Sequence, residues 1–437
     1  MKKIITLVNS LLLLGGMATA QETIYPAKAQ KGLLFLKNGT VHVGNGTVLE
    51  NATIKIKDGK IEEVGVGLAI PADDVAVFDV KGKHVYPGLI LPASSLGLQE
   101  ISGIRSTTDL TEIGDVNPSV RSIVAYNADS KITNTLRSNG ILLAHVAPVG
   151  SLVGGTSSVV QLDAWNWEDA AYKADMGMQL YMPSLLSRPG GRFGALFAQF
   201  FSVQGDPTKE ALDKIDAVKQ FFREAKAYFA QESKEPNLKL EAARPLFEKK
   251  QKLYVHCSQV KQMLIAIDFA KEFGFEVVLI GASDAWQIAD LLKQHNVAVI
   301  MSQMHDLPTL DDDDIDMPYK RAAILQKAGV LFCINDDDPQ NRGRNLAFNA
   351  GTAAAYGLSK EEALGAITLN TAKVLGIDNT TGSIEKGKDA NIIVSDGDIL
   401  DMKSSVVQHA FIQGRKLVLD DKHKQLYERY KYKYGIK

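Results

Sequence analysis

Cysteine and surplus charge of either sign are scarce in this chain. Cys257 and Cys333 are the two cysteines among 437 residues, and each lies in an apolar run. Their spacing gives no disulfide framework, so buried free thiols are expected. The formal net charge is -2 at pH 7, which gives no basic footprint for binding nucleic acid. Hydrophobic residues make up 45% of the chain, enough for a large globular core.

The chain also lacks a good membrane span at its N-terminus. The apolar run over residues 4–17 is too short to cross a bilayer. Lys2 and Lys3 precede this run, and the small residues Ala18-Thr19-Ala20 follow it. This order is typical of a signal peptide over residues 1–20. It predicts cleavage near Ala20–Gln21 and export to the periplasm or the extracellular space, without stable membrane insertion.

Short alternating strands with turn residues occupy both ends of the mature chain. Asn38–Gly39, Asn45–Gly46 and Asp58–Gly59 are predicted turns, and "TIKIK" over residues 53–57 alternates as a half-buried strand does. "DANIIVSDGDIL" and "VVQHAFIQGRKLV" near the C-terminus repeat this pattern. We therefore expect a small composite β-sandwich domain, formed by residues 21–84 and by residues 381–437, the latter including a C-terminal tail.

Strand and helix patterns alternate between these ends, over residues 85–380. Ser359 and Glu362 have the spacing of a capping box at the start of one helix. The pattern predicts an α/β fold with a (β/α)8 TIM barrel, whose chemistry would sit at the C-terminal ends of the strands. The eight predicted strands cover residues 85–91, 141–147, 157–162, 176–182, 252–257, 276–281, 297–302 and 330–335.

Several segments carry a resemblance to a known family. They include "VYPGLI", "HVAPVGSLVGGTSSVV", "LYVHC", "GVLFCINDD" and "GLSKEEALGAITLNTAKVLGIDNTTGSIEKGKDANIIV". The chain resembles the amidohydrolase superfamily, in particular its imidazolonepropionase-like and dipeptidase-like branch, over nearly everything after the signal peptide. The resemblance implies a site for one or two divalent metals, usually zinc, that lower the pKa of a bound water.

Most of the ligand positions implied by the resemblance are replaced. Strand 5 keeps His256 and strand 8 keeps Asp336, which the resemblance makes candidate metal ligands and catalytic groups. One histidine and one aspartate fall short of the three protein ligands usual for catalytic zinc. Gln179, or alternatively Gln161, stands where a carbamylated lysine is expected. The other replaced positions are Leu91, Ala93, Ser95 and Gly281.

Other side chains are candidates for the same pocket. His145 and His305 could rebuild a metal site together with the retained pair, or they could be a core and a loop histidine. Trp165 and Trp167 are candidate ligand-stacking residues at the barrel mouth, or core residues. Arg342 and Arg344 are candidate partners of a substrate carboxylate, or surface residues.

Two functions remain open from the sequence. The first is an exported hydrolase of non-peptide carbon–nitrogen bonds, as in cyclic amides, or of small dipeptides, with most metal ligands replaced. The second is an inactive, metal-free protein that binds a ligand or a partner on the same fold. The cofactor is then either absent or a single divalent metal, with zinc expected. The expected partners are a small amide or peptide ligand and either a second copy or an active amidohydrolase relative, but no nucleic acid.

Overall fold

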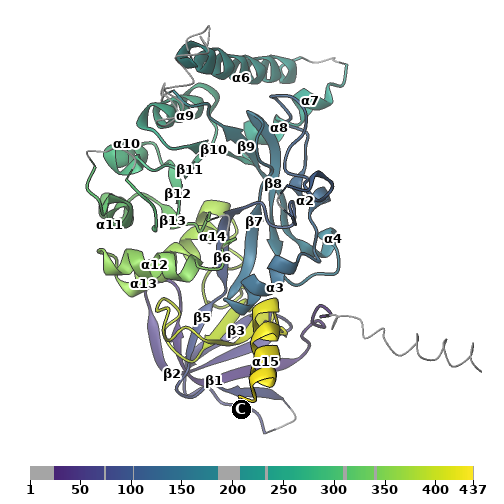
Figure 1. Ribbon diagram of the computed structural model, residues 1–437, viewed down its shortest axis with the longest axis vertical. Coiled ribbons are helices and arrows are strands. Elements are labelled where there is room, and N and C mark those ends of the chain that lie inside the picture. The colour runs from purple at the N-terminus through teal and green to yellow at the C-terminus, as the bar shows by residue number, and fades with distance from the viewer. Residues whose placement is uncertain are drawn as a thin grey trace, which may run out of the picture.

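The computed structural model describes residues 24–72, 75–101, 103–185, 207–231, 235–308, 313–338 and 342–436. The predicted signal peptide, residues 1–20, lies outside this part of the chain. Among the described residues, no helix is long and apolar enough to cross a membrane. Figure 1 shows a β-rich lower part, with a larger part above it in which helices surround a second sheet.

The two ends of the chain share one eight-stranded sheet. Its strand order is β16-β15-β14-β5-β1-β2-β3, with β4 beside β1. Leu36 and Ile54 from the first half of this sheet pack with Ile392 and Phe411 from the second half in a core of their own. The predicted composite β domain is therefore confirmed. Its strands are β1 (Leu33–His42), β2 (Val48–Lys57), β3 (Lys60–Val66), β4 (Ala76–Asp79), β5 (His84–Pro87), β14 (Ile392–Ser395), β15 (Val407–Ile412) and β16 (Arg415–Lys416).

Turn residues explain most of the connections in this sheet. Asp58 and Gly59 join β2 to β3 with φ angles of 49° and 82°, the two positive values that a type I′ hairpin requires. Asn45 accepts a 3.1 Å hydrogen bond from the backbone of Thr47, which closes the turn between β1 and β2. The turn predicted at Asn38–Gly39 is wrong. There the chain continues as β1 and forms a bulge, because β2 pairs with β1 on both sides of that point.

The barrel sheet has eight strands, and seven of them match predicted strands; the predicted strand 85–91 is divided between β5 of the β domain and β6 of the barrel. The barrel strands follow one another in sequence order from β6 to β13 around the sheet, as Figure 1 shows. Every neighbouring pair is parallel except those involving β8, which is antiparallel to both β7 and β9. The strands are β6 (Leu89–Ser94), β7 (Ile141–Val146), β8 (Val153–Gln161), β9 (Ala171–Tyr181), β10 (Lys252–Cys257), β11 (Val277–Gly281), β12 (Ala298–Met301) and β13 (Phe332–Ile334).

The direction of β8 corrects the expected strict alternation of strand and helix. Only residues 147–152 join β7 to β8, and residues 162–170 join β8 to β9. A connection between parallel neighbours needs a dozen or more residues, so these short links force antiparallel pairing. As a result, the C-terminal end of β8 lies at the opposite end of the barrel from the C-terminal ends of the other strands.

The barrel interior is filled by side chains at alternate strand positions. Leu143, Val159, Tyr254 and Ile300 pack there in a common core, as the layers of a TIM barrel do. Gly177 makes room for this packing, because a Cβ at that position would lie 2.1 Å from the Tyr254 ring. Polar residues occupy the next layer toward the C-terminal strand ends.

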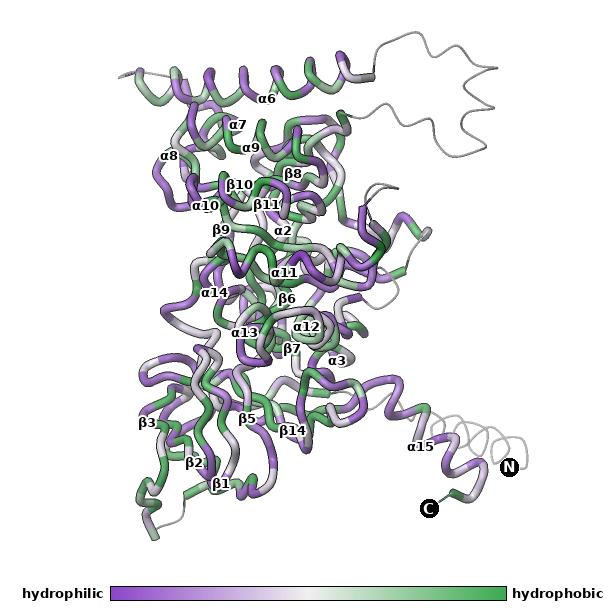
Figure 2. Tube along the Cα trace, turned by 90° about the vertical axis from the view of Figure 1, so that its left-hand side faces the viewer, coloured by the Kyte–Doolittle hydropathy of each residue, from purple (hydrophilic) through white to green (hydrophobic). Residues whose placement is uncertain are grey.

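Helices cover the outside of the barrel. Figure 2 shows α6 along the top with alternating hydrophilic and hydrophobic stretches, and α15 projecting from the body. The capping box predicted at Ser359 and Glu362 is confirmed, and Cys257 and Cys333 are buried and free as expected. The helices are α2 (Ser122–Ala125), α3 (Lys131–Ser138), α4 (Trp167–Ala170), α6 (Pro207–Phe229), α7 (Leu238–Glu241), α8 (Arg244–Phe247), α9 (Val260–Phe273), α10 (Ala289–Gln294), α11 (Met317–Ala328), α12 (Leu346–Ala355), α13 (Lys360–Ala366), α14 (Leu369–Leu375) and α15 (Lys422–Tyr434), with 3-10 turns η1 (Arg105–Thr107) and η2 (Ala285–Ile288).

Candidate functional site

A cavity of about 410 Å³ opens at the C-terminal ends of the barrel strands. This volume falls within the range of small-molecule sites. His256 and Asp336, the two retained positions, both line it, and so do Ala93, Ser95 and Arg342. The structure therefore brings the retained and two of the replaced positions into a single pocket, called the mouth pocket below.

Asp336 follows β13 and is 3% exposed. Its Oδ2 accepts a 2.7 Å hydrogen bond from the backbone of Asn345. Its Oδ1 is buried and has no hydrogen-bond partner among the described residues. Burial raises the pKa of this carboxyl to about 6, although nearby backbone N–H groups of Asn345 and Asp338 offset part of the shift. The pocket thus contains a carboxyl oxygen with no internal partner and a pKa close to neutrality.

His256 lies on β10, lines the mouth pocket and contacts two neighbouring side chains. Its ring stacks on Tyr181 with centroids 3.9 Å apart and planes 13° apart. Its Nε2 lies 2.9 Å from Oε1 of Gln179 on the neighbouring strand β9. Burial is the main cause that lowers the pKa of His256 to about 3, with a smaller contribution from His145. The imidazole is therefore neutral at physiological pH.

The contacts of His256 continue into the barrel wall. Gln179 Nε2 donates to Ser157 Oγ at 2.8 Å, and Ser157 Oγ lies 2.7 Å from His145 Nε2. His145 Nδ1 lies 2.7 Å from the carbonyl oxygen of Pro92. The side chains of His145, Ser157 and Gln179 have no exposed surface. Sequence reasoning named His145, Gln179 and His256 separately, but it missed that Ser157 joins them.

These residues fall short of a divalent metal site, because Nδ1 of His256 and Oδ1 of Asp336 are two open donors where three protein ligands are usual. Both ring nitrogens of His145, Nε2 of His256 and both polar atoms of the Gln179 amide are already hydrogen-bonded. A protonated amide nitrogen or an alanine offers a metal no lone pair. Among the described residues, no group of three or more His, Cys, Asp or Glu side chains is placed to hold a metal ion.

The backbone explains one of the replaced positions, Gly281, and shows where another, Ala93, lies. Gly281 ends β11 with φ 88°, and a Cβ there would lie 3.0 Å from the carbonyl oxygen of Cys257. A histidine at this position would be strained whatever its rotamer. Ala93 lies at the edge of the sheet, where its N–H donates a 3.3 Å hydrogen bond to Asn335 Oδ1 and so links β6 to the end of β13.

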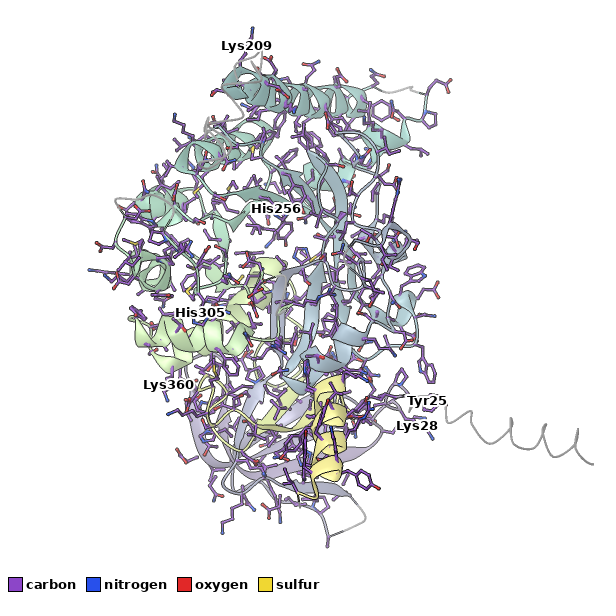
Figure 3. The ribbon with its side chains drawn as sticks, viewed as in Figure 1. Tyr25, Lys28, Lys209, His256, His305 and Lys360 are labelled. Carbon is purple, nitrogen blue, oxygen red and sulfur yellow. The ribbon has the colours of Figure 1, made fainter. Side chains whose placement is uncertain are left out.

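Two other candidates lie outside the mouth pocket. His305 is exposed, and its Nε2 contacts Thr352 Oγ1 at 2.8 Å; Figure 3 shows it well apart from His256. Arg344 turns toward α15, where its NH1 lies 3.4 Å from His423 Nε2. Neither residue lines the mouth pocket, which agrees with the loop interpretation of His305 and the surface interpretation of Arg344.

The direction of β8 removes three further candidates from the site. Gln161 ends β8 and bonds to the Asp169 carbonyl and to Arg415. Trp165 is 66% exposed, and its ring centroid lies 6.1 Å from that of Tyr25. Figure 3 places Tyr25 at the side of the molecule, away from His256. Trp165 lines a second cavity of about 930 Å³. Trp167 packs against the outer core. The two tryptophans are therefore not at the barrel mouth.

Known proteins resemble this chain in sequence and fold. Residues 248–417 match the model of the amidohydrolase family. An imidazolonepropionase from Picrophilus torridus is 32% identical over 177 residues, which are 38% of this chain and 42% of that protein. The chain thus matches less than half the length of that curated relative.

Solved structures cover more of the chain. An amidohydrolase from Thermotoga maritima superposes with a TM-score of 0.74 and 25% identity, over 88% of this chain and 99% of that one. An Xaa-Pro dipeptidase with methionine bound in its active site superposes with a TM-score of 0.52 and 14% identity, over 88% of this chain and 99% of that one. At this lower identity the likeness concerns the fold alone.

Proposed function

Because this chain belongs to the amidohydrolase superfamily, we propose that it hydrolyses an amide-type carbon–nitrogen bond in a small ligand. The ligand would be a cyclic amide or a dipeptide bound in the mouth pocket. The observation that carries the proposal is the buried Oδ1 of Asp336, which has no hydrogen-bond partner within the described structure and lines that pocket. A buried acceptor left unpaired in this way is costly unless a ligand or a water satisfies it.

Asp336 is the group suited to move protons in this reaction. A carboxyl with a pKa of about 6 is mostly ionised at neutral pH, so it can accept a proton. Once protonated, it can donate that proton again. It would take a proton from water as the water oxygen attacks the amide carbon, and it would return that proton to the leaving nitrogen. His256, with a pKa of about 3, is too weak a base for this role and instead orients the ligand.

Two further groups in the pocket support binding. Arg342 lines the mouth pocket and brings a permanent positive charge among the carboxylates of Asp336, Asp337 and Asp338. It would pair with a carboxylate of the ligand. The hydroxyl of Ser95 lines the same pocket and is a donor available to the carbonyl oxygen under attack. No step is assigned to a metal, because the interior donors do not fit one.

Export is part of the proposal. The charged and apolar pattern of residues 1–20 supports a cleaved leader and activity outside the cytoplasm. The mass of the chain recovered from a host with a secretion pathway would show whether cleavage occurs near Ala20–Gln21.

The test is turnover of a panel of lactams, hydantoins and dipeptides. Asp336→Asn should abolish hydrolysis of any active substrate without unfolding the chain. Asp175→Asn is the control, because Asp175 pairs with Arg121 outside the mouth pocket. Binding without turnover across the panel would overturn the hydrolase and favour a ligand-binding protein. Turnover that survives Asp336→Asn would overturn the role of Asp336.

A further inference from the structure

Five neighbouring strands of the barrel each contribute one member to a line of hydrogen bonds. In sheet order they are Pro92 on β6, His145 on β7, Ser157 on β8, Gln179 on β9 and His256 on β10. The reversed direction of β8 is what places Ser157 between His145 and Gln179. The line ends at the mouth pocket, which His256 helps to form.

The first bond fixes the direction of the next. The carbonyl oxygen of Pro92 only accepts, so His145 Nδ1 carries a hydrogen. His145 is fully buried, and its two ring nitrogens contact a carbonyl and a hydroxyl rather than a carboxylate, so its ring is neutral and Nε2 is an acceptor. Ser157 therefore donates its proton to His145 Nε2 at 2.7 Å rather than to the Gly177 carbonyl at 3.1 Å.

The same logic orients the amide and the last imidazole. With its proton given to His145, Ser157 Oγ can only accept, so the NH2 group of Gln179 faces it. The opposite amide orientation would set two acceptors against each other at 2.8 Å. Gln179 Oε1 then faces His256 Nε2 at 2.9 Å, and Nε2 must carry the hydrogen. This leaves Nδ1 of His256 as a lone-pair acceptor, which has no hydrogen bond among the described residues.

We propose that this directed line replaces the metal centre of the superfamily and holds His256 as the Nε2–H tautomer, so that Nδ1 selects ligands presenting an N–H donor. Gln179, Ser157 and His145 are then positioning residues, since they act through His256. The inference rests on the proposed function only in using the same pocket. The ligand class it adds is a lactam, imide or ureide with a free N–H. A ligand fully N-alkylated at that nitrogen would be rejected.

The tautomer can be measured directly by nitrogen NMR of the full chain labelled at its 8 histidines, with His256→Gln giving the assignment. We expect Nε2 of His256 to resonate as a protonated nitrogen and Nδ1 as an unprotonated one, unchanged between pH 5 and pH 8. Ser157→Ala should replace this single state by a mixture of both tautomers. Ser158→Ala is the matched control, because it removes a buried hydroxyl from the same strand that bonds instead to Asp175.

A protonated Nδ1 in the wild-type chain would overturn the inference, and so would a Ser157→Ala chain with an unchanged tautomer. Should Ser157→Ala fail to fold, the wild-type spectrum decides alone. Ligand choice is tested with hydantoin and its N,N′-dimethyl derivative, for which binding should differ by about tenfold or more. Equal binding, or binding of neither, overturns the ligand class. The tautomer does not depend on turnover, so its failure is distinguishable from that of the hydrolase proposal.

Discussion

Gln179 Oε1 accepts a 2.9 Å hydrogen bond from His256 Nε2 across the neighbouring strands β9 and β10. Where the superfamily resemblance implies a bridging lysine and a histidine on one metal, this chain joins an amide to an imidazole directly. The bond engages Nε2 of His256 and Oε1 of Gln179, so neither atom is free to bind a metal. The consequences for stability, pH dependence and ligand binding can each be measured.

Replacing Gln179 by Met keeps the length of the side chain and removes both hydrogen bonds. His256 Nε2 would be left without its partner, and Ser157 Oγ would lose one of its hydrogen bonds while it keeps the one to His145. We expect Gln179→Met to lower the free energy of unfolding by about 1–3 kcal/mol. Chemical denaturation measures the change. The exposed Gln220→Met on α6 is the control and should stay within about 0.5 kcal/mol of wild type; equal effects would contradict a buried line of hydrogen bonds.

The raised pKa of Asp336 predicts the pH dependence of stability. Its folded-state pKa of about 6 lies above the ordinary aspartate pKa of 3.8, so its protonated form stabilises the folded chain below about pH 3.8. That contribution is lost as the pH rises through 6. Asp336→Asn should therefore be more stable than wild type at pH 8, by up to about 3 kcal/mol.

Thermal unfolding of both chains from pH 4 to pH 8 checks this sign. The advantage of Asp336→Asn should shrink steadily toward pH 4. An advantage that grows at low pH would show that the carboxylate is stabilised by a partner, which contradicts the unpaired Oδ1.

Asp163 should be among the least replaceable acids of the chain. It is 2% exposed and pairs with Arg137 at 2.6 Å and with Arg415 at 3.1 Å. Asp163→Asn would leave two buried guanidinium groups without their counter-charge. We expect a loss of about 3–5 kcal/mol in unfolding free energy, against less than about 1 kcal/mol for Asp175→Asn in its more exposed pair with Arg121. A small effect at Asp163 would mean that water reaches the pair.

Arg342 and Arg344 provide a matched pair for ligand recognition. Arg342 lines the mouth pocket, whereas Arg344 contacts His423 of α15. Arg342→Gln should weaken binding of a carboxylate-bearing ligand by tenfold or more, since a charged hydrogen bond contributes about 1.5–3 kcal/mol. Arg344→Gln should leave affinity unchanged. Calorimetry with a dipeptide and with its C-terminal amide measures these affinities. The amide lacks the carboxylate, so it should bind Arg342→Gln and wild type alike.

Local patterns in the sequence predicted much of this fold. The turn at Asp58–Gly59 follows from two residues that tolerate positive φ, and the helix start at Ser359 follows from its capping partner Glu362. Seven of the eight barrel strands lie where apolar runs predicted them, whereas the predicted strand 85–91 covers β5 of the β domain and only the start of β6. The direction of β8 was missed, because it depends on the length of two connections rather than on the composition of the strand.

That one direction accounts for the main errors at the site. Trp165 follows β8 and was expected at the barrel mouth, but it lies at the other end. Ser157 bonds to side chains 12 and 22 residues away on two other strands. No local pattern encodes such contacts, since they depend on register across the sheet. The retained His256 and Asp336 were identified only because the resemblance marked their positions.

Metal content tests the central claim most directly. The chain from Gln21 would be purified without a histidine tag, incubated with excess zinc, manganese, iron or nickel, desalted and analysed for metal per chain. The account predicts no stoichiometric metal, with ligand binding unchanged by a chelator. One tightly held metal per chain that disappears in His256→Ala would contradict it, because Nδ1 of His256 would then be a metal ligand and not the acceptor that selects ligands with an N–H.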